Sequence, residues 1–355
     1  MSGPRDSLHE SRGAPHRPEG GTTENEACRV ALALSELRGI GRAALRAQLP
    51  LAAGQAIDSF ALFATFVGQH GPDAGLLDFG EPSLLAVWDR AGLLLDECTR
   101  LGLQVLPFGW PSYPRQLCRL QDAPALLFVR GSLIPERRPR IAVIGTRHAS
   151  PWGIRTAKAC AGQVARVQGV VVSGLARGID SAAHTGSLEA RGSTWAVLAH
   201  GLAVAPTSNI ELAHRIVAEG GALISEYRPG EPPRRHHFIE RDRIQAGLAD
   251  AVLVVETGAQ GGSMHTVHSA TSAGIPVWTA FPDRDLGVAR EDPGQLKETQ
   301  RGTWKLVLEG ARRVSTPRML LQCIESLPDD RIVASAARSE DPSAAAAPGW
   351  RRTIE

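Results

Sequence analysis

The chain has 355 residues, of which 43% are hydrophobic and 21% charged, and its formal net charge is +2. This composition is ordinary for a soluble globular protein, and the length predicts two or three structural units. The small net charge excludes neither nucleic acid nor small anions as ligands, because local clustering of charge matters more than the sum.

The cysteines and the apolar runs indicate the compartment. Five scattered cysteines without metal-ligand spacing predict free thiols in a reducing compartment, not a disulfide framework or a zinc site. No run of about 18 apolar residues occurs, and the N-terminal sequence lacks the apolar core of a secretory signal. We therefore expect a cytoplasmic protein that makes no contact with membranes.

Both ends of the chain are expected to lack a fold. Residues 1–25 are rich in Gly, Pro, Glu, Arg and Ser and have almost nothing to bury, which is typical of disorder. Residues 316–355 are interpreted as a short C-terminal segment, largely disordered, which ends in a low-complexity tail from about 337.

Residues 26–105 are expected to form a small helical domain (of the SAM or helix-hairpin-helix type), because their apolar residues recur at helical spacing. Within it, the segment 37–41, Leu-Arg-Gly-Ile-Gly, resembles a helix-hairpin-helix turn that presents backbone amides to a phosphate. A tight helix–helix connection without a ligand explains the same residues.

Residues 106–315 predict an extended Rossmann-like domain. Short apolar strands are expected at 125–129, 141–144, 170–172, 194–198, 222–224, 251–255 and 276–279, and amphipathic helices lie between most of them. Strands that alternate with helices favour a doubly wound α/β fold, with a mostly parallel sheet and helices on both faces. In such folds ligands bind beyond the carboxyl ends of the strands.

Candidate phosphate-binding residues therefore follow each strand. Gly145, Thr146 and Arg147 follow the strand at 141–144, and Ser150 and Gly153 open the next helix. Glycine permits a sharp turn, hydroxyl groups and helix amides suit a phosphate, and arginine adds a bidentate donor.

The loop after the strand at 170–172 carries Ser173, Gly174, Arg177 and Gly178, a second backbone cradle. Gly262 and Ser263 form a similar small-residue cradle at a helix start after the strand at 251–255. The dinucleotide-binding pattern GxGxxG is absent after the strand at 141–144.

The most basic segment is 234–243, where four arginines and two histidines surround Phe238. Arginines such as Arg241 and Arg243 neutralise phosphates, and an aromatic ring stacks on an unpaired base, so the segment suits single strands better than duplex. A solvated loop paired with Glu231, Glu240 and Asp242 is the alternative.

Few residues suit catalysis. His184, His265 and His268 are conceivable bases, but each is better interpreted as packing or hydrogen-bonding locally. We predict no catalytic residue, no metal and no cofactor, which favours binding over turnover.

Several segments in the same order resemble the DprA/Smf family, among them IAVIGTRHASPWG, VVSGLARGIDSAAHTGSLEARG, HHFIERDRIQAGLADAVLVVE and GGSMHT. The resemblance covers about 110–285. It implies a Rossmann-like homodimer that binds single-stranded DNA and loads RecA during natural transformation. The DNA contacts that it implies are Gly145, Arg147, Ser173, Gly174, Phe238, Arg241 and Arg243, with Gly262 and Ser263 nearby.

Three features depart from the pattern of that family. Asp242 stands where the family usually has asparagine, and Ala203 replaces an acidic residue. The residues after about 315 are too few and too polar for the C-terminal winged-helix-like domain of many members.

Two other functions stay open. Related Rossmann domains use glycine loops for nucleotides, so a nucleotide-binding sensor or nucleotide hydrolase is one alternative. A diverged interaction scaffold is the other, because Asp242 and Ala203 weaken the case for a DNA pocket.

Overall fold

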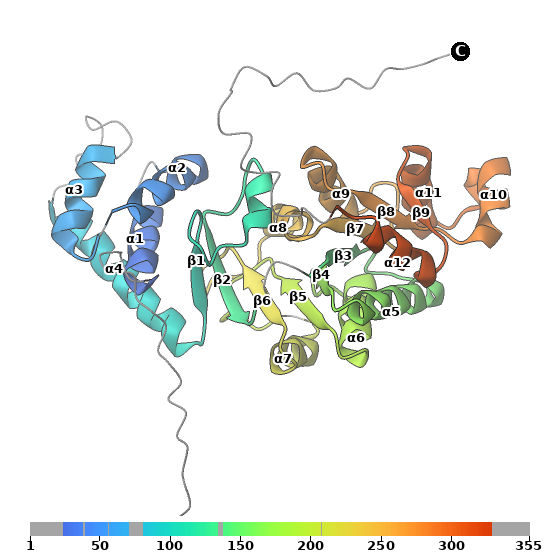
Figure 1. Cartoon of the computed structure of the whole chain (residues 1–355), viewed down its shortest axis with the longest axis horizontal. Coiled ribbons are helices and arrows are strands. Elements are labelled where there is room, and N and C mark those ends of the chain that lie inside the picture. Colours follow the sequence, from blue (N-terminus) through green and yellow to red (C-terminus); the bar gives the residue numbers. More distant parts are fainter. Residues whose placement is uncertain are drawn as a thin grey trace, which may run out of the picture.

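A computed structural model describes residues 24–37, 40–55, 57–70, 81–133, 138–206 and 208–328 (Figure 1). The expected disordered segment 1–25 lies outside these ranges apart from its last two residues, which begin the first helix. The C-terminal tail beyond 328 also lies outside them.

The N-terminal part is helical, as expected. Its helices are α1 (Glu24–Glu36), α2 (Arg42–Ala53), α3 (Phe60–His70) and α4 (Glu81–Arg100). They bury Leu32, Phe63 and Trp88 in one core that continues onto β1 and β2, the strands beside them in Figure 1. Arg38 and Gly39 of the proposed helix-hairpin-helix turn lie outside the described residues, so its phosphate-binding role stays a prediction.

The described residues form one nine-stranded sheet in the order β1-β2-β6-β5-β4-β3-β7-β8-β9. The strands are β1 (Gln104–Pro107), β2 (Leu126–Gly131), β3 (Arg140–Ile144), β4 (Val170–Ser173), β5 (Ser193–Val197), β6 (Ala222–Ser225), β7 (Ala251–Val254), β8 (Val277–Ala280) and β9 (Arg312–Val314). β1 and β2 are antiparallel additions at one edge, and the pairs from β6 to β9 are parallel. The doubly wound α/β fold is confirmed.

The central strands are buried on both faces of the sheet. Successive side chains of a strand point to opposite sides, and helices cover both of these sides. In β3, Ile141 and Val143 pack under one set of helices, whereas Ala142 and Ile144 pack under the other. The first set is α5 (Pro151–Arg166), α6 (Ile179–Glu189) and α12 (Pro317–Glu325), and the second includes α8 (Arg235–Leu248) and α9 (Ser263–Ser272).

The remaining elements lie between or beyond these layers. They are α7 (Ile210–Ala218), α10 (Leu286–Glu291), α11 (Glu298–Leu308) and the short 3-10 helices Arg115–Arg119, Asp283–Asp285 and Pro293–Gln295. No helix in the described ranges is both long and apolar enough to cross a membrane.

The C-terminal segment 316–355 begins with an ordered helix, whereas residues 329–355 lie outside the described ones, so the expected disorder of most of the segment stays a prediction. Thr316 caps α12 by accepting a hydrogen bond from the Met319 amide, and Leu320 and Ile324 are buried against the layer that contains α5. Burying such side chains contributes about 2 kcal/mol each, enough to order a helix of this length on a preformed surface.

The chain reverses its direction of travel across the sheet between β3 and β7. From β3 it moves through β4, β5 and β6, and α8 then carries it back to β7 on the other side of β3. Such a switch point leaves a crevice outside the carboxyl ends of the two strands. The candidate site lies there.

Candidate nucleic-acid interface

Two adjacent cavities open at the carboxyl edge of the sheet, with volumes of about 610 and 420 Å³. Both are lined by Arg147, Ala176, Phe238 and Arg241. We call the two together the groove. Of the residues proposed from the sequence, it brings together Gly145, Thr146, Arg147, Gly174, Arg177, Phe238, Arg241, Gly262 and Ser263.

The glycines after β3 and β4 serve close packing. A Cβ atom on Gly145 would lie 2.5 Å from the Ile179 side chain, and one on Gly178 would lie 2.4 Å from the Thr146 carbonyl oxygen. Gly178 also has a positive φ of 84°, which favours glycine. The Thr146 amide donates to the Glu256 carbonyl at 2.7 Å, so it is not free to meet a phosphate.

The N-terminus of α5 is occupied by a side chain of the protein itself. One Glu256 carboxylate oxygen accepts from the Ser150 amide at 2.8 Å, and the other accepts from the Ser150 hydroxyl at 2.6 Å. Ser150 in turn accepts from the Gly153 amide. The interpretation of Ser150 and Gly153 as a phosphate cradle is therefore wrong, because a buried carboxylate already fills that position.

The basic segment is a helix and not a loop. Arg234 is the N-cap of α8, and residues 235–243 form the first nine residues of that helix, after Pro232 and Pro233. Phe238 faces the groove with 37% of its surface exposed, and the Arg147 guanidinium lies 5.4 Å from the centre of its ring. Arg147 comes from the loop after β3, so an exposed cation and an exposed aromatic ring meet from two different elements.

Arg241 supports the groove from below. It is 5% exposed and donates to the carbonyl oxygens of Gly174 and Val197, at the carboxyl ends of β4 and β5. Ser173 is fully buried and donates to the Val143 carbonyl at 2.7 Å. Direct contact of Ser173 with DNA is therefore corrected to bracing between β4 and β3, and Arg241 contributes its charge to the floor.

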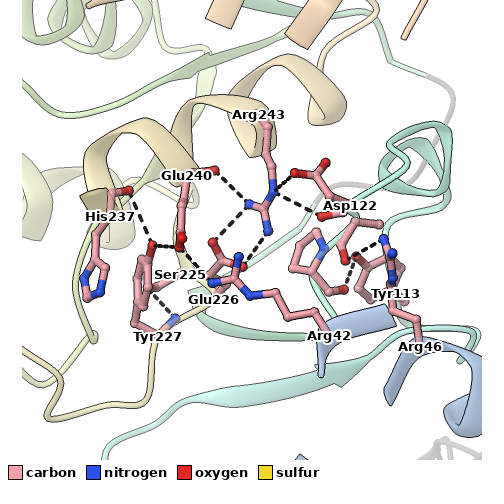
Figure 2. A network of polar contacts seen from close by, with 12 residues as sticks. Arg42, Arg46, Tyr113, Asp122, Ser225, Glu226, Tyr227, His237, Glu240 and Arg243 are labelled. Carbon is pink, nitrogen blue, oxygen red and sulfur yellow. Dashed lines mark hydrogen bonds and ion pairs between the residues drawn. The ribbon is translucent and has the colours of Figure 1, made fainter. Parts of the chain in front are cut away.

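Arg243 lies outside the groove, on another face of α8 (Figure 2). Its guanidinium makes hydrogen bonds of 3.0 and 2.8 Å to the two carboxylate oxygens of Glu226 and pairs with Asp122 at 2.9 Å. Both Arg243 and Glu226 are nearly buried. The expected phosphate contact by Arg243 is thus corrected to an internal ion pair.

The same face of α8 contacts the N-terminal helices. Arg42 of α2 pairs with Glu240 at 2.7 Å, and Glu240 also accepts from the Tyr227 hydroxyl at 3.0 Å (Figure 2). α8 is therefore held on one face by these polar contacts and presents Phe238 to the groove on the other.

Two carboxylates lie beneath the groove. Asp180 accepts from the amides of Gly174 and Ala176, and burial raises its pKa to about 6 against the opposing charge of Arg241. Asp242 accepts from Arg241 Nε at 3.2 Å. Burial raises the pKa of Asp242, while Arg241, His265 and Arg147 act to lower it.

The three histidines considered as bases differ in position. His184 is fully buried against the Thr194 hydroxyl at 2.7 Å, and burial lowers its pKa to about 3, as expected of a packed residue. His265 is exposed and lines the groove beside the first turn of α9, whereas His268 is exposed outside it. Among the described residues, no group of three or more His, Cys, Asp or Glu is arranged to hold a metal ion.

One wall of the groove was not predicted from the sequence. The segment after β5 contributes Leu198, Ala199, His200, Ala205, Pro206 and Ser208. Its residues are mostly apolar or small, so nothing in their chemistry points to a ligand. The available signal was topological, since every strand of a doubly wound sheet sends its carboxyl end to this edge.

A doubly wound sheet with an arginine and an aromatic ring at its switch point defines a Rossmann-like binding protein. Residues 104–325, more than half of the chain, match the family model of DNA recombination-mediator protein A. The chain belongs to that family of DNA-processing proteins.

Known relatives agree with this assignment. The DNA processing protein DprA of Bacillus subtilis is 32% identical over 216 residues, which are 60% of this chain and 68% of that protein. The crystal structure of DNA processing protein A from Streptococcus pneumoniae superposes with a TM-score of 0.64 at 27% identity, and the match covers 85% of this chain and 98% of the other. The Helicobacter pylori protein, whose structure concerns its binding of single-stranded DNA, shares the fold (TM-score 0.54, 23% identity, 63% of this chain and 95% of that one).

Proposed function

We propose that this protein binds single-stranded DNA in the groove and holds it without chemical turnover. The observation that carries the proposal is the meeting of Arg147 with the exposed ring of Phe238, 5.4 Å apart, where the two cavities join. The cation neutralises a phosphate, and the ring offers a stacking surface to a base.

The exposed ring favours a single strand over duplex. A base can lie flat on Phe238 only when its face is not already stacked and paired inside a double helix. Stacking of this kind contributes about 1–3 kcal/mol per base and depends little on sequence.

Other donors extend along the groove on both sides of this pair. Arg177 and Arg235 are exposed, and Gly262 and Ser263 lie at the N-terminus of α9, where the helix dipole favours an anion. We place the sugar-phosphate backbone over these groups.

The finer roles belong to the same proposal. We propose that a cytoplasmic homodimer protects incoming strands and assists the loading of RecA in natural transformation or recombination. A RecA-loading assay on coated strands, with sedimentation of the free protein, tests these two points separately from strand binding.

The binding test is a titration of fluorescent oligo-dT at several salt concentrations. We expect Arg147→Ala to weaken binding by roughly 1 kcal/mol or more, about fivefold, and to reduce the slope of log K against log salt by about 0.7, the loss of one phosphate contact. Arg147→Lys should retain the slope, because the charge is kept.

Arg166→Ala is the matched control, because Arg166 is an exposed arginine at the end of α5, at the opposite edge of the sheet. It should leave both affinity and slope unchanged. No binding of oligo-dT by the wild type at low salt, together with thermal stabilisation by a nucleoside monophosphate, would instead support a small-nucleotide sensor.

A further inference from the structure

Two acidic side chains, Asp180 and Asp242, line an otherwise cationic groove, and Asp180 already accepts from the amides of Gly174 and Ala176. Asp242 lies in the wall of the 610 Å³ cavity, and its side chain is 13% exposed. One carboxylate oxygen accepts a hydrogen bond from Arg241. A carboxylate offers about four lone-pair sites on two oxygens, so it retains capacity for a ligand.

Asp242 shares its face of α8 with the stacking residue. Phe238 and Asp242 are four residues apart in a helix, which places them one above the other on one side. Both line the larger cavity, together with the exposed aliphatic side chain of Ile239. The volume lies within the range of about 300–1,000 Å³ typical of small-ligand pockets, so one base with its sugar fits.

The chemistry of this wall suits a base and not a phosphate. A phosphate beside Asp242 would meet a like charge, whereas Arg177 and Arg235 offer it cations elsewhere on the groove. An ionised carboxylate only accepts hydrogen bonds, so it requires an N–H group from the ligand. Acceptance from cytosine N4 is an established pairing for aspartate.

We propose that Asp242 makes the groove selective for bases that carry an exocyclic amino group, cytosine above uracil or thymine. Cytosine and uracil differ at position 4, where the amino group of one is replaced by the carbonyl oxygen of the other. The first donates to Asp242, and the second places an acceptor against it. This inference rests on the proposed function, since it requires that a strand enter the groove.

The test compares the affinities of oligo-dC and oligo-dU of equal length for the full-length protein at pH 7.5 and moderate salt. We expect oligo-dC to bind roughly tenfold tighter, the effect of one hydrogen bond to a charged acceptor. In Asp242→Asn the ratio should fall to within about twofold of unity, because an amide turns to offer either a donor or an acceptor. Arg166→Ala should keep the wild-type ratio.

A second measurement needs no variant. An oligonucleotide of N4,N4-dimethylcytosine lacks the donated N–H, and the wild type should bind it about as weakly as oligo-dU.

Equal affinity of the wild type for oligo-dC and oligo-dU overturns the selectivity and leaves strand binding intact. An unchanged ratio in a folded Asp242→Asn overturns the role of Asp242, and no binding of either strand overturns the proposed function itself.

Discussion

Arg241 and Arg243 lie two positions apart in one basic segment, yet their surroundings give them different roles. Arg241 holds the carboxyl ends of β4 and β5 from beneath the groove, whereas Arg243 is paired with Glu226 on another face of the helix. The sequence predicted that these arginines cluster, but not that their side chains take different faces of α8. Which face each arginine takes depends on where the carbonyl and carboxylate partners lie in the folded chain.

Replacing Arg243 by alanine therefore tests a structural role. The change leaves the buried Glu226 carboxylate without its partner, which costs roughly 3–5 kcal/mol of the free energy of unfolding. Urea denaturation measures this loss, and the double variant Arg243→Met with Glu226→Gln should recover part of it. A stable Arg243→Ala protein with weakened oligo-dT binding would contradict this assignment.

The buried carboxyl of Asp180 predicts a pH dependence of stability. Its pKa is raised from 3.8 to about 6, so the folded state binds the proton more tightly than the unfolded chain. Between about pH 4 and pH 6 this group therefore lowers the free energy of unfolding as the pH rises, by roughly 3 kcal/mol in total.

Asp180→Asn removes the titration and keeps an oxygen that accepts from the amides of Gly174 and Ala176. The difference in the free energy of unfolding, variant minus wild type, should increase between pH 4 and pH 6 and remain constant above that window. A difference that is flat from pH 4 to pH 7 would show that Asp180 titrates normally in the folded protein.

At the scale of elements, α8 has the central position. One face lines the groove through Phe238 and Asp242, and another is anchored to Glu226 and to Arg42 of α2. The helix approaches the end of β4 so closely that a Cβ atom on Gly174 would lie 2.3 Å from the Arg241 guanidinium. The close approach of Arg241 accounts for a glycine at this position.

Gly174→Ala should displace Arg241 from its two carbonyl partners and lower the free energy of unfolding by roughly 1–3 kcal/mol. Gly162→Ala in α5 is the matched control, because its new Cβ would meet only the Ala190 side chain at 3.9 Å. That control should stabilise the protein by up to about 1 kcal/mol. Equal effects of the two changes in thermal denaturation would contradict the close approach of α8 to β4.

At the scale of the whole molecule, the central sheet was predictable because its strands are short apolar runs bounded by turns and alternating with helices. β1 and β9 were not, since short edge strands such as Arg312–Val314 carry no such pattern and exist only through pairing with a neighbour. α12 did have a signal, a Thr-Pro start followed by Leu320 and Ile324 at helical spacing. The polar residues beyond it concealed that signal.

The sequence likewise predicted part of the candidate site and not the rest. Topology and residue type pointed to Arg147, Phe238 and the start of α9, which the groove brings together. The internal partners of Ser150, Ser173 and Arg243 depend on contacts distant in sequence, and no local pattern reveals them.

The central claim is that a single strand lies across the switch point, on Phe238 and beside Arg147. Photo-crosslinking of an oligo-dT that carries 5-iododeoxyuridine, followed by peptide mass spectrometry, locates the bound bases directly. We expect adducts at Phe238 or His265. The adduct at Phe238 should disappear in Phe238→Ala, and the yield of both adducts should fall in Arg147→Ala. Adducts confined to the N-terminal helices α1–α4, with none on α8 or α9, would contradict the proposed interface.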